Sequence, residues 1–308
     1  MSRKIICTIS VATYKRPELL SKLIFSLLYQ KISDNIKLEI IIVDNDKEAS
    51  AKNIVKDFIK NSDITIKYFN QPIKNISITR NVGIENATGE YIAFIDDDET
   101  ADEKWISNLI SCTSKYHADA VFGYVIPVFE EPSPKWFKQR ELYFRPINPT
   151  GSEPDFWYTT NCLIKSNVLK QNGILFDENR GLSGGEDGLF FRALKKRFNA
   201  KFVCCQEAIS YELVPLKRQS TKYLCSRNFQ IGNLYAKRRM NEKKTLFLIN
   251  WFLLFSRFSL AFIYHLLCVV FLYLNKSKWI FSYTAFCAAT GKIAGLFNYK
   301  YEHYNKFE

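Results

Sequence analysis

The feature of this sequence that most constrains its fold is a short apolar strand that runs directly into four acidic residues. Residues 91–95 read Tyr-Ile-Ala-Phe-Ile, and Asp96, Asp97, Asp98 and Glu99 follow at once. Four adjacent carboxylates at the end of a buried strand repel one another and lose hydration, so we expect a cation there. Carboxylate oxygens suit Mg²⁺ or Mn²⁺, which commonly share their coordination sphere with phosphate oxygens. The alternative is a solvated turn that favours aspartate.

The N-terminal third alternates predicted strands with predicted helices. The strands are expected at 4–11, 38–43 and 64–69, and the helices between them at 18–30 and 51–60. Crossovers of this length require parallel strands with right-handed connections. The polar strand ends at Thr13 and Asp44 then share the carboxyl edge of the sheet with the acidic run, where open parallel sheets bind ligands.

The middle of the chain continues the same α/β pattern. Ser77 is a candidate N-cap for a helix that ends near 87–89. Further helices are expected at 102–117, 166–171 and 189–198, and strands at 118–126, 156–164, 201–205 and 207–211. A proline-rich segment, 127–152, is predicted as a loop, either near the active site or as a plain surface connection. The acids Glu186 and Asp187 end a glycine-rich loop, where helix capping is the alternative to a functional role.

Net charge and cysteine content limit the kinds of partner and the cellular compartment that we expect. The formal net charge of +12 indicates an anionic partner: nucleic acid, an anionic membrane leaflet or a phosphorylated small molecule. Much of this excess lies beside the apolar C-terminal part and is not interleaved with aromatics, so we expect no nucleic-acid partner. The eight cysteines lack zinc spacing and predict buried thiols in a reducing compartment. The N-terminus shows no signal-peptide pattern, which predicts a cytoplasmic catalytic part.

The C-terminal third predicts membrane association. A basic segment, 215–244, precedes two apolar runs at 246–274 and 279–297. These runs predict either helices that span the membrane or helices that lie in its plane, and a soluble helical dimer interface is the remaining alternative. The basic segment is expected on the cytoplasmic side. The predicted domains are therefore a catalytic domain at 1–214, a basic helical linker at 215–245 and membrane-associating helices at 246–308.

Five motifs occur together in one order along the chain. They are the turn at 13–17 after the first strand, Asp44 at the end of the second, the Arg-Asn-x-Gly helix at 80–83, the Asp-Asp-Asp strand end at 96–98 and the Gly-Gly-Glu-Asp loop at 184–187. Over residues 4–211 this set resembles the family 2 glycosyltransferases. The resemblance implies the GT-A fold: an α/β fold with a mostly parallel central sheet and helices on both faces.

The resemblance also implies a donor site for a nucleotide-diphosphate sugar. Thr13, Tyr14 and Arg16 match the turn that holds the nucleotide, and Asp44 matches the acid that contacts base and ribose. A carboxylate accepts the imide N–H of uracil, so a UDP-sugar is the expected donor, and a guanosine or thymidine donor is the alternative. Arg80 matches the segment beside the diphosphate, and a salt bridge from Arg80 to the strand-end acids is an equal alternative.

The implied chemistry is metal-dependent transfer with inversion. Asp98 matches the metal ligand for Mn²⁺ or Mg²⁺, and Asp96 faces the ribose or the metal's water shell. The register within the acidic run stays open, since Asp97 is able to replace either neighbour. Asp187 matches the catalytic base, and Glu186 is expected to contact the acceptor or brace the loop.

The expected function is addition of a single sugar to a hydroxyl of a lipid-linked or surface-glycan acceptor at the cytoplasmic face of the membrane. The processive members' Gln-x-x-Arg-Trp motif is absent from the sequence, and Arg218 is instead a candidate contact for donor phosphate or lipid-linked acceptor. Two alternatives remain. One is transfer directly onto polyprenyl phosphate, and the other is a catalytically silent membrane-associated binding or scaffold protein.

Overall fold

The computed structural model describes residues 4–137, 143, 148–170, 173–242 and 247–301. The chain divides into two compact units. The first contains the residues up to 128 together with 145–181 and 185–213, and is here called the catalytic unit because the predicted base Asp187 and the acidic run belong to it. The second, the C-terminal unit, contains 129–144, 182–184 and the residues from 214 onward.

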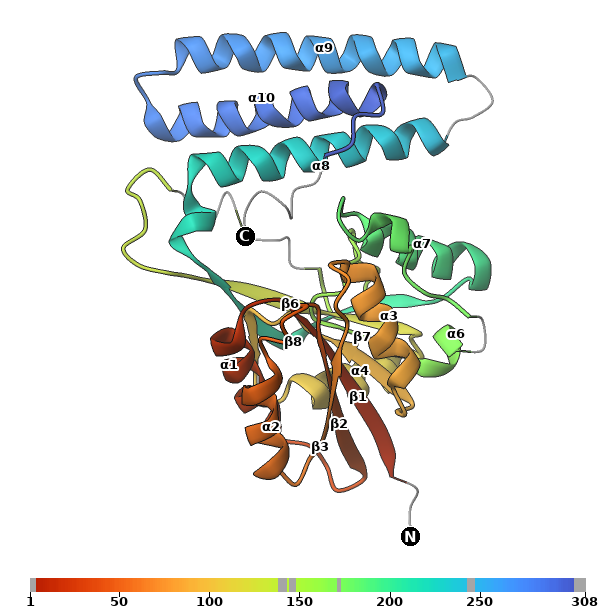
Figure 1. Cartoon of the computed structure of the whole chain (residues 1–308). Coiled ribbons are helices and arrows are strands. Elements are labelled where there is room, and N and C mark those ends of the chain that lie inside the picture. The colour runs from red at the N-terminus through yellow and green to blue at the C-terminus, as the bar shows by residue number, and fades with distance from the viewer. Residues whose placement is uncertain (1–3, 138–142, 144–147, 171–172, 243–246, 302–308) are drawn as a thin grey trace. The chain divides into compact units, whose positions relative to one another are not determined.

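One eight-stranded sheet forms the centre of the catalytic unit, in the order β3-β2-β1-β4-β7-β6-β8-β5 (Figure 1). Its strands are β1 (Ile5–Thr13), β2 (Ile36–Asp44), β3 (Thr65–Asn70), β4 (Tyr91–Phe94), β5 (Glu99–Ala101), β6 (Ala120–Phe129), β7 (Cys162–Lys165) and β8 (Phe202–Val214). The neighbours β3, β2, β1 and β4 are all parallel, as the crossover lengths predict. The strands β7 and β5 join antiparallel, to β4 and β8 respectively, so the complete sheet is mixed.

Helices cover both faces of the sheet (Figure 1). They are α1 (Pro17–Leu28), α2 (Lys52–Lys60), α3 (Ile76–Asn86), α4 (Trp105–Tyr116), α6 (Ser166–Lys170) and α7 (Glu186–Phe198). Alternate side chains of β2 separate two hydrophobic cores: Ile40 and Ile42 pack with α1, α2 and α4, while Ile41 and Val43 pack with α3, α6 and α7. A strand buried on both faces explains the continuous aliphatic run of the sequence.

A buried carboxylate on β2 ties four segments of this sheet together. Glu39 is almost fully buried and accepts a hydrogen bond from Thr8 Oγ1 at 2.6 Å, one from the Thr88 amide at 3.0 Å, and an ion pair from Lys67 Nζ at 2.5 Å. Burial alone raises the pKa of Glu39, but these donors outweigh it and lower the pKa below its ordinary value. The charge is therefore compensated by the elements around it.

Several predicted boundaries need correction. Ser77 is not the cap of α3, because the Asn75 side chain accepts the Ser77 and Ile78 amides. The two short strands expected at 201–205 and 207–211 form the single strand β8. The strand expected from residue 156 begins only at Cys162, and α7 begins at Glu186, three residues earlier than predicted. Part of the predicted loop at 127–152 lies outside the described residues.

The C-terminal unit contains three long helices that lie side by side, α8 (Thr221–Glu242), α9 (Phe247–Phe271) and α10 (Lys276–Leu296), after the short 3₁₀ helix η2 (Leu216–Gln219) (Figure 1). The helix α10 lies between the other two. Backbones of α8 and α10 approach closely, since a Cβ added at Gly232 lies 2.0 Å from the Ala288 carbonyl oxygen and one at Gly291 lies 2.0 Å from that of Phe229. Glycine is required at both positions for this packing.

Substitution of the buried Glu39 tests this reading of the sheet. We expect Glu39→Gln to lower the free energy of unfolding by about 1–3 kcal/mol, because a charged acceptor of several hydrogen bonds is lost. The lowered pKa means that the wild-type advantage is complete above the ordinary glutamate pKa of about 4.3 and disappears as the pH falls below it. Urea unfolding at several pH values measures both effects. The exposed Asp34→Asn is the control, and equal stability of both variants at pH 7 contradicts the interpretation.

Candidate active site

The central acid of the run, Asp97, faces inward and fixes the turn after β1. Its carboxylate accepts hydrogen bonds from Thr13 Oγ1 at 2.8 Å and from the Tyr14 amide at 3.4 Å, and pairs with Arg16 Nη1 at 3.0 Å. Arg16 Nη1 also reaches Asp98 Oδ2 at 3.1 Å. The residues expected to hold the nucleotide are therefore gathered at the end of β4 by Asp97, and the side chain of Asp97 is engaged by the protein itself.

Asp44 has a similar internal role at the end of β2. The residue is fully buried, and its carboxylate accepts hydrogen bonds from the Ala51 amide at 2.8 Å, the Asp46 amide at 3.1 Å and Tyr68 Oη at 2.9 Å. These contacts close the turn between β2 and α2. Asp44 thus lies at the predicted edge of the sheet, with its two oxygens directed to protein donors.

Arg80, on α3, joins the two halves of the predicted site. Its Nη1 lies 2.7 Å from Glu186 Oε1 and 2.9 Å from Asp187 Oδ1, and its Nη2 lies 3.6 Å from Asp96 Oδ1. The guanidinium is nearly buried and its Cζ lies 5.6 Å from the centre of the Phe176 ring. The expected salt bridge to the strand-end acids is present, and it extends to the acids of α7.

The other residues of the Arg-Asn-x-Gly motif hold Arg80 in place. Asn81 donates from Nδ2 to the Phe176 carbonyl at 3.0 Å and accepts the Phe176 amide at 2.8 Å, which fixes the ring beneath the guanidinium. A Cβ at Gly83 is only 2.1 Å from Ser10 Oγ, so glycine allows α3 to pack closely against β1. The motif therefore fixes the position of the Arg80 guanidinium through the packing of its neighbours.

Asp187 is held by donors from two directions while part of its surface stays open. Thr159 donates to Oδ1 from its Oγ1 at 2.9 Å and to Oδ2 from its amide at 3.3 Å, and Arg80 Nη1 also binds Oδ1. The side chain remains 21% exposed. Its neighbour Glu186 is buried, and its Oε2 has no hydrogen-bond partner among the described residues. The helix N-cap is Gly185, with φ of 80°, so neither acid serves as the cap that their position suggests.

Crowding of these acids changes their protonation. Burial raises the pKa of Glu186 to about 7, and the nearby Asp187 charge adds to this effect. Burial likewise raises the pKa of Asp97 to about 6, although Arg16 opposes this shift. Asp96 is partly exposed, but loss of hydration on its protein-facing side and the neighbouring carboxylates raise its pKa to about 7 against the charge of Arg80. The pKa of Glu99 lies well above its ordinary value for the same reason. Negative charge in this region exceeds what the two arginines compensate.

The donor set at this edge fits a hard divalent cation that a ligand helps to hold. Asp96 and Asp98 flank the inward-facing Asp97, and the Asp96 side chain is 43% exposed. The buried Oε2 of Glu99 has no hydrogen-bond partner among the described residues, and its pKa is already raised, so a further acid at this edge lacks a compensating cation. No group of three or more His, Cys, Asp or Glu side chains in the described part of the chain is arranged to hold a metal alone. Phosphate oxygens of a substrate are needed to complete such a shell.

Sequence reasoning missed two threonines of the site. Thr159 orients Asp187, and Thr160 donates to the buried Glu99 through a short hydrogen bond. The polar run Thr-Thr-Asn at 159–161, directly before β7, marks another strand end, but its spacing does not reveal the contact with Asp187 or Glu99. Arg218 belongs to η2 of the C-terminal unit, so its predicted role stays a prediction.

Comparison with known proteins identifies the family. Residues 8–176, more than half of the chain, match the family described as Glycosyl transferase family 2. The chain belongs to this family. The succinoglycan biosynthesis protein ExoM of Rhizobium meliloti is 33% identical over 230 residues, which are 74% of each protein. This family 2 glycosyltransferase is also 29% identical to the glucosyl-dolichyl phosphate glucuronosyltransferase of Haloferax volcanii, over 58% of the chain and 57% of that relative.

Solved structures show the same fold. The crystal structure of residues 1–349 of S. aureus TarS in complex with UDP superposes with a TM-score of 0.54. The alignment covers 94% of this chain and 91% of that one, at 17% sequence identity. The sheet described above is therefore the GT-A fold that the motifs imply, and the protein is a glycosyltransferase.

Removing the Arg80 cation tests its role as the link between the acids. We expect Arg80→Ala to lower the free energy of unfolding by about 3–5 kcal/mol, because three carboxylates lose a buried partner. Arg80→Lys keeps the charge but cannot reach three acids at once, so its loss is smaller. Thermal unfolding measures both. The exposed Arg197→Ala on α7 is the control, and equal losses for Arg80→Ala and Arg197→Ala contradict the assignment.

The raised pKa of Glu186 predicts a pH dependence of stability. A carboxyl group whose pKa is raised by folding binds its proton more tightly in the native state, so it favours the native state at low pH. That contribution is lost as the pH rises through about 7. We expect the unfolding free energy of the wild type to fall relative to Glu186→Gln between about pH 5 and pH 8. The exposed Glu85→Gln on α3 is the control, and parallel curves for all three proteins contradict the prediction.

Proposed function

We propose that this family 2 glycosyltransferase transfers one sugar, with inversion, from a UDP-sugar to a hydroxyl of a lipid-linked or surface-glycan acceptor, with Mn²⁺ or Mg²⁺ as cofactor. The observation that carries the proposal is the arrangement around Arg80. One guanidinium binds Asp187 through Nη1 and Asp96 through Nη2, so a partly open carboxylate and the acids of the strand end lie on either side of one cation. A transferase needs these two functions side by side: a base for the acceptor and a site for the departing diphosphate.

The donor site is assigned to the carboxyl edge of β1, β2 and β4. The turn at 13–16 offers its backbone and Arg16, and the ammonium groups of Lys15 and Lys74 each lie 5.3 Å from the centre of the Tyr14 ring. This cationic surface suits a nucleoside diphosphate. Asp44 shapes the base and ribose site by holding the turn after β2. The UDP complex of TarS, which shares this fold, supports a uridine nucleotide as the donor.

The catalytic step is assigned to Asp187. Thr159 Oγ1 and Arg80 both donate to Oδ1, and Oδ2 accepts only the longer bond from the Thr159 amide at 3.3 Å, so we assign Oδ2 to accept the proton of the acceptor hydroxyl. As that proton leaves, the hydroxyl oxygen forms the new bond to the anomeric carbon, and the bond to the donor's diphosphate breaks with its electron pair. Attack opposite the leaving group inverts the configuration. Asp98 and Asp96 would hold the divalent cation, which supplies charge neutralisation for the diphosphate.

The acceptor and location follow from the relatives and from α9. ExoM is named for succinoglycan biosynthesis, and the Haloferax relative for transfer to glucosyl-dolichyl phosphate. One helix segment of the described chain, Ile249–Phe271, is long and apolar enough to enter a membrane. We therefore place the protein at the cytoplasmic face of the membrane, where lipid-linked glycans and nucleotide sugars meet.

Two substitutions separate the proposed roles. Asp187→Asn should lower the rate of transfer by about 10²–10⁴-fold while donor binding persists, because only the base is lost. Asp98→Asn should lose the increase in melting temperature that a nucleoside diphosphate gives with Mn²⁺. Nucleotide diphosphate release from a panel of UDP-sugars and a thermal-shift screen measure the two effects. The exposed Asp57→Asn is the control, and wild-type rates for Asp187→Asn across the panel disprove the mechanism.

The same assay separates the alternatives carried from the sequence. In transfer onto polyprenyl phosphate the nucleophile is a phosphate oxygen, which needs no base. The transfer rate of Asp187→Asn is then only slightly lower than that of the wild type, and the extracted product is destroyed by mild acid. A product that survives mild acid favours a glycan hydroxyl. A silent scaffold releases no nucleotide diphosphate with any donor.

A further inference from the structure

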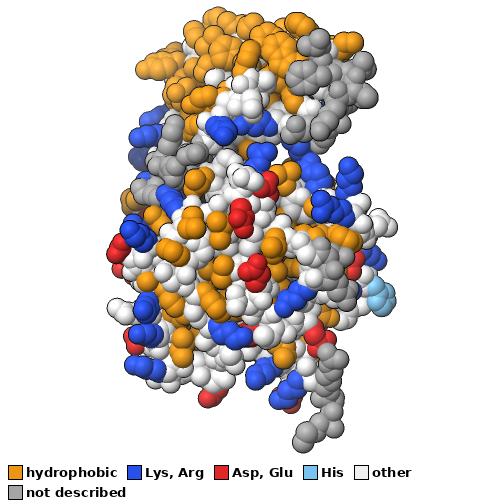
Figure 2. Space-filling view, turned by 45° about the vertical axis from the view of Figure 1, so that its right-hand side comes forward, with side chains coloured by type: hydrophobic (Ala, Val, Ile, Leu, Met, Phe, Trp, Pro, Cys, Tyr) orange, Lys and Arg blue, Asp and Glu red, His pale blue; other side chains and the backbone are white. Residues whose placement is uncertain are grey.

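The outer face of α9 is apolar except for Ser256 and Arg257 near its middle, both of which are exposed. Large side chains from one end of the helix to the other are more than half exposed, among them Phe252, Leu253, Leu260, Ile263, Leu267 and Phe271. The opposite face is also apolar, and its Leu254 and Phe258 are buried in the core of the C-terminal unit. Hydrophobic side chains accordingly gather over this end of the unit (Figure 2). A surface helix normally carries a polar outer face, so α9 requires a cover.

The charges of this segment favour an anionic lipid surface over a second copy of the chain. Residues 247–300 contain five Lys or Arg residues and no Asp or Glu. Two copies that meet through α9 bring these like charges together, whereas anionic headgroups neutralise them. Aromatic side chains at both ends of the hairpin, such as Tyr273 and Tyr299, are exposed and suit the boundary between lipid and water.

Packing of α10 on α8 excludes a hairpin that crosses the membrane. The helices α8 and α10 run in parallel with their backbones in contact at Gly232, Gly291 and Gly295. If α9 and α10 cross the bilayer, α8 enters the hydrocarbon with them. That helix carries five cationic residues, Lys222, Arg227, Lys237, Arg238 and Arg239, and the non-helical Pro215 segment comes shortly before it. Charged side chains and irregular backbone facing lipid are both strongly unfavourable.

We propose that α9 lies in the plane of an anionic membrane, with its outer face at the boundary between headgroups and acyl chains and with α10 and α8 on the side of α9 away from the acyl chains. This mode deepens the membrane location stated above and rests on it. Apolar burial supplies most of the affinity, and the cations supply the preference for anionic lipid.

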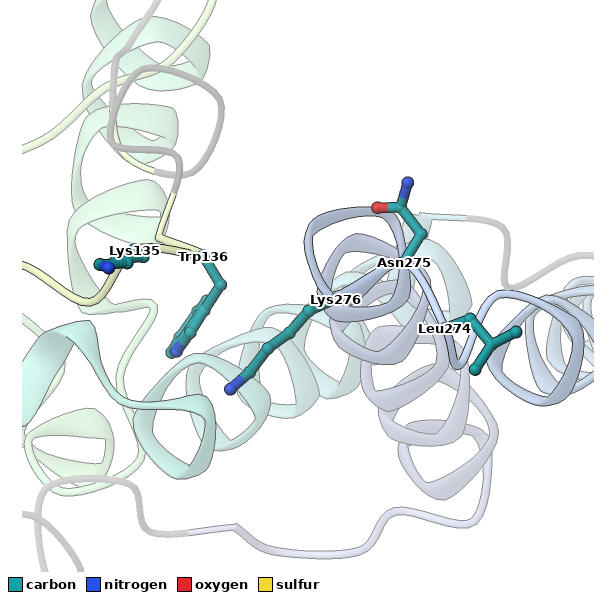
Figure 3. A pocket seen from close by; sticks show the side chains of 5 residues that line it. All are labelled: Lys135, Trp136, Leu274, Asn275 and Lys276. Atoms are coloured by element: carbon teal, nitrogen blue, oxygen red, sulfur yellow. The ribbon is translucent and has the colours of Figure 1, made fainter.

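An open pocket of about 420 Å³ at the α9–α10 turn fits the edge of such a surface. Lys135, Trp136, Leu274, Asn275 and Lys276 line it, and the Lys276 side chain extends toward Trp136 (Figure 3). The Leu274 side chain is 97% exposed. Two ammonium groups beside an indole ring suit the phosphate of a lipid headgroup, while Leu274 reaches the acyl region. The pocket is therefore assigned to an anionic headgroup at the rim of the bound face.

Flotation of the full chain with lipid vesicles tests the bound face. Wild type should float with vesicles of phosphatidylcholine and phosphatidylglycerol. The double variant Leu260→Glu, Leu267→Glu should lose about 100-fold or more in vesicle affinity, since two exposed leucines no longer enter lipid. An unchanged melting temperature shows that the variant is folded. The control Phe25→Glu changes an equally exposed apolar residue on α1 and should float like wild type. Equal flotation of the double variant overturns the proposal.

The pocket and the in-plane mode have their own readouts. Lys135→Gln and Lys276→Gln should each cost about fivefold in affinity for anionic vesicles and nothing on phosphatidylcholine alone. A specific protease site inserted between Leu274 and Asn275 should be cut by protease added outside sealed vesicles. Protection of that site until detergent is added means that the turn has crossed the bilayer, and it overturns the in-plane mode. Equal affinity of both lysine variants and wild type overturns the headgroup assignment.

If a second copy of the chain covers the outer face of α9, the experiments give different results. Light scattering then shows a dimer that the double leucine variant converts to a monomer, and vesicle binding is absent from the wild type. Flotation needs neither donor nor acceptor, so its failure leaves the transferase proposal standing. Asp187→Asn, which is expected to lose transfer, should float like wild type.

Discussion

The buried guanidinium of Arg80 is the interaction on which the rest of the catalytic unit depends. Asp96, Glu186 and Asp187 come from two segments about ninety residues apart, and their mutual repulsion alone would drive α7 away from the end of β4. One planar cation with several donors is able to hold all three, which a lysine is not. The position of this cation is fixed by its surroundings: Asn81 holds Phe176 beside the guanidinium, and Gly83 lets α3 pack closely on β1.

The acidic run itself divides into inward and outward members. Asp97 is the structural member, because Thr13, Tyr14 and Arg16 all bind its carboxylate and thereby fix the turn after β1. Asp98 shares Arg16 with Asp97 and is only 9% exposed, whereas Asp96 faces Arg80 and is 43% exposed. The middle acid thus builds the site, and Asp96 is the member of the run most open to a cation and its phosphate ligand. The raised pKa values of Asp96 and Glu186 show that the protein alone does not fully compensate these charges.

Features set by local pattern were predictable from the sequence, and features set by distant partners were not. The continuous aliphatic run of β2 predicted a strand buried on both faces, and crossover length predicted its parallel neighbours. The three-residue β5 begins inside the acidic run and exists because it pairs with β8, over a hundred residues away. Thr159 was missed for the same reason, since its role depends on a contact with Asp187 that no spacing reveals. At the start of α3, Asn75 and Ser77 are both good capping residues, and the backbone geometry chose Asn75.

For the C-terminal helices, hydropathy does not distinguish a membrane-spanning α9 from one that lies on the membrane, and helix packing is needed to do so. Composition alone allowed α9 to span a membrane or to lie on it, because length and apolarity are the same in both cases. The difference lies in α10, whose glycines are committed to the backbone of α8 and not to another membrane helix. A Gly-x-x-x-Gly pattern such as that at 291–295 is commonly associated with helix pairing inside lipid. Here it packs α10 onto a strongly basic helix, and this packing supports the in-plane mode proposed for α9.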